Sequence, residues 1–99
     1  EYDGIIREYV LHVPDSYDST ASVPLVFNFH GGGGTATGQM YLSNMDLVAD
    51  TAGFIIAYPQ GSNLSVGGSH WNSMIATEDN KSSTDDIGFI SFLIILVVV

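Results

Sequence analysis

The sequence contains no cysteine and only two basic side chains, and both absences exclude whole classes of function. Without cysteine, the chain forms no disulfide and offers no thiolate to a metal ion. Nucleic-acid binding depends on clustered Lys and Arg, but Arg7 and Lys81 stand here against eleven acidic residues, giving a net charge of −9. The same imbalance disfavours an anionic membrane surface. We therefore expect neither nucleic acid nor a membrane as a partner.

The sequence starts without a basic segment followed by an apolar one, so we expect no signal peptide within it. The protein is then either cytoplasmic or already separated from a leader, and the sequence does not choose between these. Its composition is that of a globular protein, because 45% of the 99 residues are hydrophobic and 11% are aromatic. We expect one domain or part of one.

The pattern of apolar residues predicts two strands in the first third of the chain. Alternation of apolar and polar side chains indicates a strand over residues 5–13, which Pro14 ends. A second strand is predicted over residues 25–30, where a mostly apolar run suits a sheet that is covered on both faces.

A helix and a third strand are predicted to follow. Ser43 is the expected N-cap, and the apolar helical face consists of Met45, Leu47, Val48, Ala49 and Ala52. Gly53 stands where a left-handed residue ends a helix, and residues 54–58 then form a buried strand. Strand, helix and strand with short connections predict a βαβ unit with a right-handed crossover.

The last third of the chain combines a long polar loop with an apolar tail. A loop as long as residues 61–83 is usually functional or partly disordered. Ser83 or Thr84 is expected to cap a further helix, with Asp85 and Asp86 in its first turn, where carboxylates complement the helix dipole.

Residues 87–99 are almost entirely apolar, but this run is shorter than the roughly 20 residues of a membrane helix. We expect a segment of the buried type whose covering partner is missing from this chain. Where its covering partner is missing, such an uncharged and β-branched run is expected to self-associate.

Four consecutive glycines at residues 31–34 follow the second predicted strand directly. Ligands of open α/β sheets bind beyond the carboxyl ends of the strands, so this loop stands at the usual place for chemistry. A backbone without side chains lets a substrate approach closely, and its amides can point at one oxygen that becomes negative during a reaction. Three interpretations compete: a flexible turn without a partner, a phosphate-binding loop and an oxyanion loop.

The neighbouring residues favour the oxyanion loop. A phosphate-binding loop needs Gly-x-x-x-x-Gly-Lys-Ser/Thr or Gly-x-Gly-x-x-Gly running into a helix, and residues 34–39 supply no lysine. His30, Gly31, Gly32 and Gly33 instead form the His-Gly-Gly-Gly sequence that esterases and lipases use for their oxyanion hole. We therefore predict that this stretch supplies oxyanion-hole donors.

Five segments carry a resemblance to a known family: REYVLHVP (7–14), PLVFNFHGGGG (24–34), GFIIAYPQG (53–61), WN (71–72) and DDIGFI (85–90). In this order and spacing they resemble secreted serine esterases, a family that contains feruloyl esterases, related carbohydrate esterases and polyhydroxybutyrate depolymerases. The resemblance covers about residues 4–93. It implies an α/β-hydrolase fold, in which helices flank a mostly parallel sheet in three layers, and it implies hydrolysis of carboxylic esters through Ser, His and Asp.

The resemblance also implies a small-molecule or polysaccharide-linked ester as substrate, no cofactor, and an extracellular or periplasmic location. In the family, the glycine loop contributes oxyanion donors, which agrees with the prediction above. Asp85 and Asp86 are interpreted as helix-start and loop-anchoring groups rather than as the catalytic acid. Trp71 and Asn72 are interpreted as residues of the pocket rim, with Trp71 packing the long loop rather than binding a sugar.

The chain departs from the family at the nucleophile. The nucleophile elbow is Gly-x-Ser-x-Gly, and no serine here has glycine at both required positions, since Ser65 lacks the first and Ser69 the second. We therefore assign no catalytic residue. Residues 1–99 are expected to be the N-terminal part of a single α/β-hydrolase domain, a truncated product or fragment that is inactive alone. The alternative is a non-catalytic remnant that binds a partner through its apolar C-terminal segment.

The three histidines, His12, His30 and His70, leave zinc binding as a further alternative. Their spacing matches no zinc signature, so no metal site is predicted. The ring of His30 is expected to support the glycine loop by hydrogen bonding, because no activated nucleophile is evident for it to serve as a base.

Overall fold

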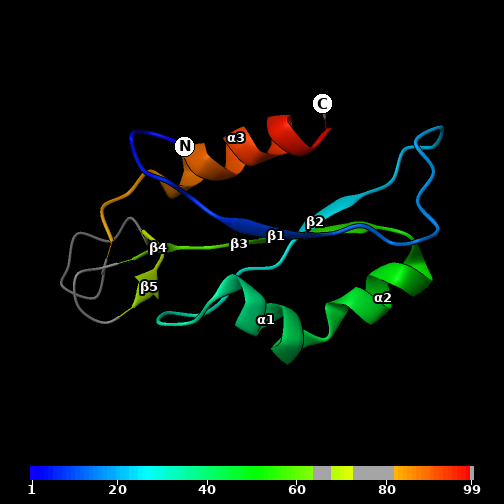
Figure 1. Ribbon diagram of the computed structural model, residues 1–99, viewed down its shortest axis with the longest axis horizontal. Coiled ribbons are helices and arrows are strands. Elements are labelled where there is room, and N and C mark those ends of the chain that lie inside the picture. Colours follow the sequence, from blue (N-terminus) through cyan, green and yellow to red (C-terminus); the bar gives the residue numbers. More distant parts are fainter. Residues whose placement is uncertain (64–67, 73–81, 99) are drawn as a thin grey trace.

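The computed structural model describes residues 1–63, 68–72 and 82–98 and shows a mixed sheet between two layers of helices (Figure 1). The three strands β1 (Tyr9–His12), β2 (Leu25–Phe27) and β3 (Ile55–Pro59) lie in the order β1-β3-β2. Strands β2 and β3 run parallel, whereas β1 runs antiparallel to β3. The expectation of a mostly parallel sheet is therefore wrong for these strands. A loop rather than a helix follows β1, and parallel neighbours usually need a helical crossover.

Both of the first two strands are shorter than predicted. In the register of β1 and β3, Tyr9 lies opposite Pro59, so Ile6 would lie opposite Ser62. Ser62 belongs instead to β4 (Ser62–Asn63), which pairs antiparallel with β5 (Ser69–His70). The chain before Tyr9 therefore has no strand partner at this point. Of the predicted loop 61–83, residues 64–67 and 73–81 lie outside the described residues.

Two helices connect β2 to β3 where one was predicted. Helix α1 (Ala36–Ser43) and helix α2 (Met45–Ala52) meet at Asn44, which has left-handed backbone angles of φ 54° and ψ 28°. The prediction of Ser43 as N-cap is wrong, because Ser43 is the last residue of α1. The prediction of a left-handed Gly53 at the end of α2 is confirmed by its φ of 79° and ψ of 48°.

The main apolar core lies between the sheet and these two helices. Its buried members are Ala36, Ala49, Ile56 and Tyr58, and the partly buried Val10, Met40, Met45 and Phe54 pack against them. The βαβ unit predicted from the sequence is therefore present, and its apolar side chains account for the position of α1 and α2 against the sheet.

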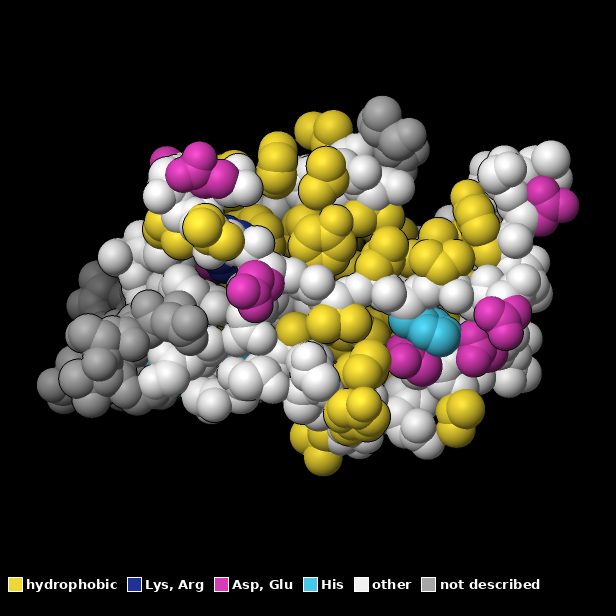
Figure 2. Space-filling model, in the orientation of Figure 1, with side chains coloured by type: hydrophobic (Ala, Val, Ile, Leu, Met, Phe, Trp, Pro, Cys, Tyr) yellow, Lys and Arg dark blue, Asp and Glu magenta, His cyan; other side chains and the backbone are white. Residues whose placement is uncertain are grey.

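The opposite face of the sheet carries α3 (Asp86–Val98) (Figure 1). Phe89 and Leu93 are buried, with 2% and 1% of their surface exposed, but Ile87 is 67% and Ile95 is 63% exposed. Much of α3 is therefore exposed, as expected for an apolar segment whose covering partner is missing, and Figure 2 shows hydrophobic side chains gathered over this helix. Val99 lies outside the described residues. No helix in the described part of the chain has the length and apolarity to cross a membrane.

Candidate functional site

The glycine loop, residues 30–34, follows β2 at the carboxyl edge of the parallel strand pair. Gln60 and Gly61 follow β3 at the same edge, because the two strands run in the same direction. The loop and the first turns of α1 line a cavity of about 510 Å³, formed by His30, Gly31, Gly32, Gly33, Gly34, Thr35, Gly38, Gln39 and Leu42. The four glycines therefore form part of a concave surface.

His30 is buried within this edge, and both of its ring nitrogens are engaged. Its Nε2 accepts the backbone N–H of Gly61 at 2.9 Å, which places the ring hydrogen on Nδ1. That Nδ1–H donates to the carbonyl oxygen of Gly31 at 2.6 Å. A ring that is engaged on both sides cannot take a proton from a nucleophile. The geometry thus gives His30 the supporting role that the sequence indicates.

Trp71 contacts the glycine loop from a distant part of the chain. Its indole Nε1–H donates to the carbonyl oxygen of His30 at 3.0 Å. Its ring lies 5.0 Å from the ring of His30, and it meets the ring of Phe29 edge-on at a centroid distance of 5.2 Å. Packing and a hydrogen bond therefore both hold the indole against the end of β2.

The loop amides divide into two pairs. The N–H of Gly33 donates to the carbonyl oxygen of Ser69 at 2.7 Å, and the N–H of Gly34 donates to the carbonyl oxygen of Gly31 at 3.0 Å. The amides of Gly31 and Gly32 donate to no acceptor within the part of the chain that the structure describes. Of the predicted oxyanion stretch, Gly31 and Gly32 are thus the residues whose amides remain able to bind a ligand.

Gln60 connects the elements around the loop, and sequence reasoning did not assign it to the site. Its side-chain Nε2 donates to Ser69 Oγ at 2.8 Å, and its Oε1 accepts the N–H of Ala36 at 2.7 Å. Its backbone N–H donates to the carbonyl oxygen of Glu8 at 2.9 Å. The one signal in the sequence is its position as a polar residue directly after a buried apolar strand.

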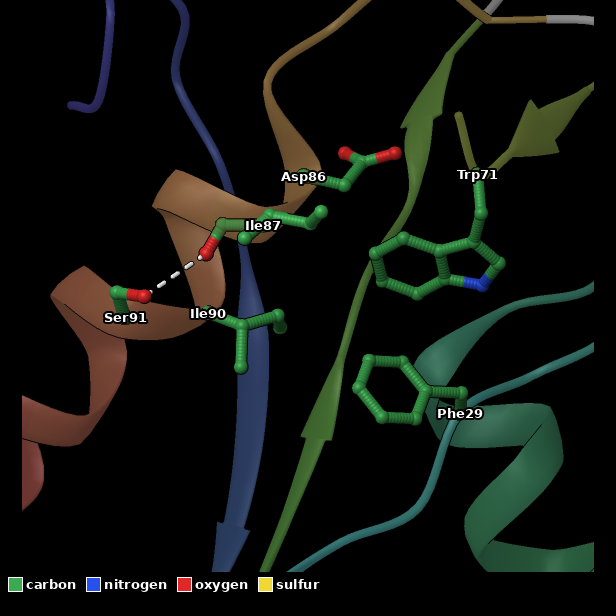
Figure 3. A pocket seen from close by; sticks show the side chains of 6 residues that line it. All are labelled: Phe29, Trp71, Asp86, Ile87, Ile90 and Ser91. Atoms are coloured by element: carbon green, nitrogen blue, oxygen red, sulfur yellow. Dashed lines mark hydrogen bonds between the residues drawn. The ribbon is translucent and has the colours of Figure 1, made fainter. Parts of the chain in front are cut away.

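An apolar groove of about 410 Å³ lies on the α3 side of the same edge, lined by Phe29, Trp71, Asp86, Ile87, Ile90 and Ser91 (Figure 3). Ile87 and Ile90 of α3 lie across the groove from Phe29 and Trp71. Phe29 and His30 are consecutive, so alternation along the extended chain directs them to opposite faces of the sheet. The groove and the glycine-loop cavity therefore lie on either side of the end of β2.

Asp86 lies in the first turn of α3, and both of its carboxylate oxygens accept hydrogen bonds. Oδ1 pairs with Arg7 Nη2 at 2.8 Å, and Oδ2 accepts the backbone N–H of Asn72. The Arg7 and Asp86 side chains are only 3% and 9% exposed, so this ion pair is buried. The side chain of Asn72 donates to the carbonyl oxygen of Thr84 at 2.9 Å. Trp71 thus lines the groove, whereas Asn72 connects the β5 end to the start of α3.

Asp85 occupies the position just before α3. Its Oδ1 accepts the N–H of Gly88 at 3.0 Å, as an N-cap side chain does, and its Oδ2 accepts the hydroxyl of Tyr2 at 2.7 Å. The hydrogen bond from Tyr2, followed by that from Gly88, lowers the pKa of Asp85. The structure therefore places both aspartates at the helix start, where they fix neighbouring segments.

The three histidines do not form one cluster, because His12 lies apart from His30 and His70. His12 lies between two carboxylates of α2, with its Nε2 at 2.8 Å from Asp50 Oδ1 and its Nδ1 at 3.5 Å from Asp46 Oδ2. His30 and His70 lie at the carboxyl edge beside the glycine loop. Among residues 1–63, 68–72 and 82–98, no three His, Asp or Glu side chains are arranged to hold a metal ion.

Comparison with known proteins gives no family: no protein-family model matches the chain, and no curated protein matches it significantly. The functional interpretation therefore depends on the sequence motifs and on the geometry of this edge.

Proposed function

We propose that this chain carries the oxyanion loop of a carboxylic ester hydrolase. The observation that carries the proposal is the pair of adjacent amides at Gly31 and Gly32, which donate to no acceptor among the described residues and lie directly beyond the carboxyl end of a parallel strand. Attack on an ester carbonyl moves negative charge onto its oxygen. Preorganised amide donors stabilise that charge in the transition state by about 2.7–4 kcal/mol each.

The apolar groove supports a substrate with an apolar or aromatic group. Phe29 and Trp71 line the groove, and both contact the His30 end of the glycine loop. An ester whose carbonyl oxygen binds the loop amides would have to pass around the end of β2 for its apolar part to contact these rings, Ile87 and Ile90, because the cavity and the groove lie on either side of that end. The resemblance to serine esterases implies that the substrate is a small-molecule or polysaccharide-linked ester. By the family resemblance, the location is extracellular or periplasmic.

The nucleophile is expected from outside these 99 residues, because none of their serines has the Gly-x-Ser-x-Gly pattern. Strand β2 is at the edge of the sheet, and α3 covers the face opposite α1 and α2. A further parallel strand after α3, joined by a right-handed crossover, would add beside β2 and end next to the glycine loop. This arrangement supports an α/β-hydrolase fold. We expect the chain alone to be inactive.

A titration followed by ¹H–¹⁵N NMR tests the proposal. The probe is the monomethyl ester of benzylphosphonate, a tetrahedral monoanion that resembles the intermediate of ester hydrolysis. We expect the Gly31 and Gly32 amide protons to move downfield, while neutral benzyl alcohol shifts neither. Shifts confined to other amides, or none, would contradict the proposal.

An activity assay tests the expected inactivity separately. The purified chain should hydrolyse p-nitrophenyl acetate no faster than buffer. Turnover that a serine-directed phosphonate abolishes would show that these residues contain a nucleophile after all.

The exposed face of α3 favours a second candidate function, self-association through residues 87–99. Ile87, Ile95 and Leu96 are each more than half exposed. Apolar patches of this kind often mark interfaces. Sedimentation velocity should show concentration-dependent association that Ile95→Lys weakens. A wild-type chain that stays monomeric at high concentration would exclude this candidate.

A further inference from the structure

We propose that Trp71 is a positioning residue that sets the direction of the Gly31 amide, an inference that rests on the proposed function of the loop. The His30 carbonyl and the Gly31 N–H belong to one planar peptide group. The Trp71 indole binds the oxygen of that group at 3.0 Å. Because the group is planar, holding its oxygen also fixes the direction in which its N–H points.

The second free donor has a separate anchor. The Gly31 carbonyl and the Gly32 N–H form the next peptide group, and its oxygen accepts His30 Nδ1–H at 2.6 Å and the Gly34 N–H at 3.0 Å. Trp71 therefore controls one donor, and His30 controls the other. In each of these two peptide groups, the carbonyl oxygen accepts a side-chain hydrogen bond, and the N–H points in the opposite direction.

These anchors are needed because glycine peptides rotate freely. A run of glycines loses more conformational freedom on ordering than any other sequence, and an unanchored loop would present its amides in many directions. Donors that must reorient during the reaction contribute less than preorganised ones. The two side-chain bonds remove this freedom without placing a side chain in the cavity.

Trp71 is itself held from both sides. Its ring packs against Phe29 and His30, and the following residue, Asn72, is bonded to Asp86 and Thr84 at the start of α3. The indole N–H thus reaches the loop from a fixed base. This connection gives the ion-paired start of α3 a part in shaping the glycine loop.

The test replaces one atom group of the indole. In Trp71→benzothienylalanine, sulfur takes the place of the N–H while the bicyclic ring keeps its shape. Rigid backbone amides have NMR order parameters of about 0.85, and flexible ones fall below about 0.6. We expect both Gly31 and Gly32 to be rigid in the natural chain, and only Gly31 to become flexible in the variant. A role in packing alone would leave both rigid or loosen both, and either result overturns the inference.

The phosphonate titration separates this inference from the proposed function. The variant should bind the monomethyl ester about fivefold more weakly, the loss expected for one hydrogen bond. Equal binding by both proteins would overturn the positioning role while leaving the oxyanion proposal intact. A natural chain that does not bind the probe, but whose Gly31 order parameter still depends on the indole N–H, would reject the proposed function alone.

A measurement on the natural chain covers the case in which the variant does not fold. The chain has a single tryptophan, so its indole N–H signal is unambiguous. Hydrogen exchange at Nε1 should be slow, because the donor is bonded. Exchange at the rate of free indole would contradict the bond on which the inference depends.

Discussion

Between the sheet and helices α1 and α2, the core cluster is apolar with Ala49, Ile56 and Tyr58 at its centre, and the Tyr58 hydroxyl donates to Asp46 Oδ1 at 2.6 Å. On the other face, α3 buries Phe89 and Leu93, and the ion pair of Arg7 and Asp86 fixes its start. The face under α1 and α2 is held mainly by its core, whereas the face under α3 is held mainly by contacts at the carboxyl edge of the sheet. The start of α3 also holds the segment that carries Trp71, and much of the rest of the helix is exposed. The contacts that fix the position of α3 are therefore concentrated at its start, beside the candidate site.

The largest expected effect on the free energy of unfolding comes from breaking the ion pair between Arg7 and Asp86 at the start of α3. Arg7→Met leaves the Asp86 carboxylate buried without its counter-ion, and such a change costs about 3–5 kcal/mol. The exposed neighbour Glu8 provides the control, because Glu8→Met should change stability by less than about 0.5 kcal/mol. Urea unfolding measured by circular dichroism would give both values. A loss below about 1 kcal/mol for Arg7→Met would contradict the account.

The apolar part of α3 provides the next comparison. Leu93 is 1% exposed and Ile95 is 63% exposed, although they lie two residues apart on one helix. Leu93→Ala should cost about 2–5 kcal/mol of the free energy of unfolding, and Ile95→Ala should change it by less than about 0.5 kcal/mol. Thermal unfolding of the two variants tests this. Equal losses would mean that the outer face of α3 is covered in solution.

Two glycines test how tightly the carboxyl edge is packed. A Cβ at Gly61 would lie 2.6 Å from the backbone oxygen of His70, whereas one at Gly31 would meet nothing within 4 Å. Gly61→Ala should therefore cost more than about 1 kcal/mol and disturb the His30 bond, and Gly31→Ala should be nearly neutral. The melting temperatures of the two variants, each compared with that of the natural chain, test this difference. A neutral Gly61→Ala would show that β5 lies farther from the loop.

The smallest expected effect is a pH-dependent one at the bond between Tyr2 and Asp85. That bond lowers the pKa of Asp85 from 3.8 and raises the pKa of Tyr2 from 10.0. The Asp85 contribution is present above its unfolded pKa of 3.8 and is lost as the pH falls through the folded value. The Tyr2 contribution is present below about pH 10 and is lost as the pH rises through its folded value.

Tyr2→Phe should therefore lower stability slightly between these limits and have no effect beyond them. Tyr17 is an exposed tyrosine, and Tyr17→Phe is the matched control. Thermal unfolding at pH 3, 7 and 11 would compare the two variants. A difference that does not depend on pH would contradict the assigned cause.

Much of the fold was predictable because local patterns carry it. The apolar run before the glycines, the left-handed Gly53 and the strand after it identify the βαβ unit from sequence alone. Helix α1 was missed because it contains Gly38, has only Ala36 buried and shows no apolar stripe. The break at Asn44 does have a local signal, since asparagine is one of the few residues that readily adopt the left-handed conformation at a helix end, but the prediction placed the start of one helix at Ser43 instead.

Less of the site was predictable, because its geometry depends on contacts between distant residues. The motif at residues 30–33 identified the glycine loop, but no local pattern indicates which amides remain free. The bond from the Gly33 N–H to the carbonyl oxygen of Ser69, and the bond from the Trp71 indole to the carbonyl oxygen of His30, join segments that are far apart in sequence. Gln60 likewise gains its connecting role only once β5 and α1 lie beside it.

A crystal structure of the chain with the monomethyl ester of benzylphosphonate bound tests the central claim most directly. The account predicts one phosphonate oxygen at about 2.7–3.1 Å from the amide nitrogens of both Gly31 and Gly32, with the benzyl group toward Phe29. A phosphonate bound elsewhere, or Gly31 and Gly32 amides that donate to protein acceptors, would contradict it.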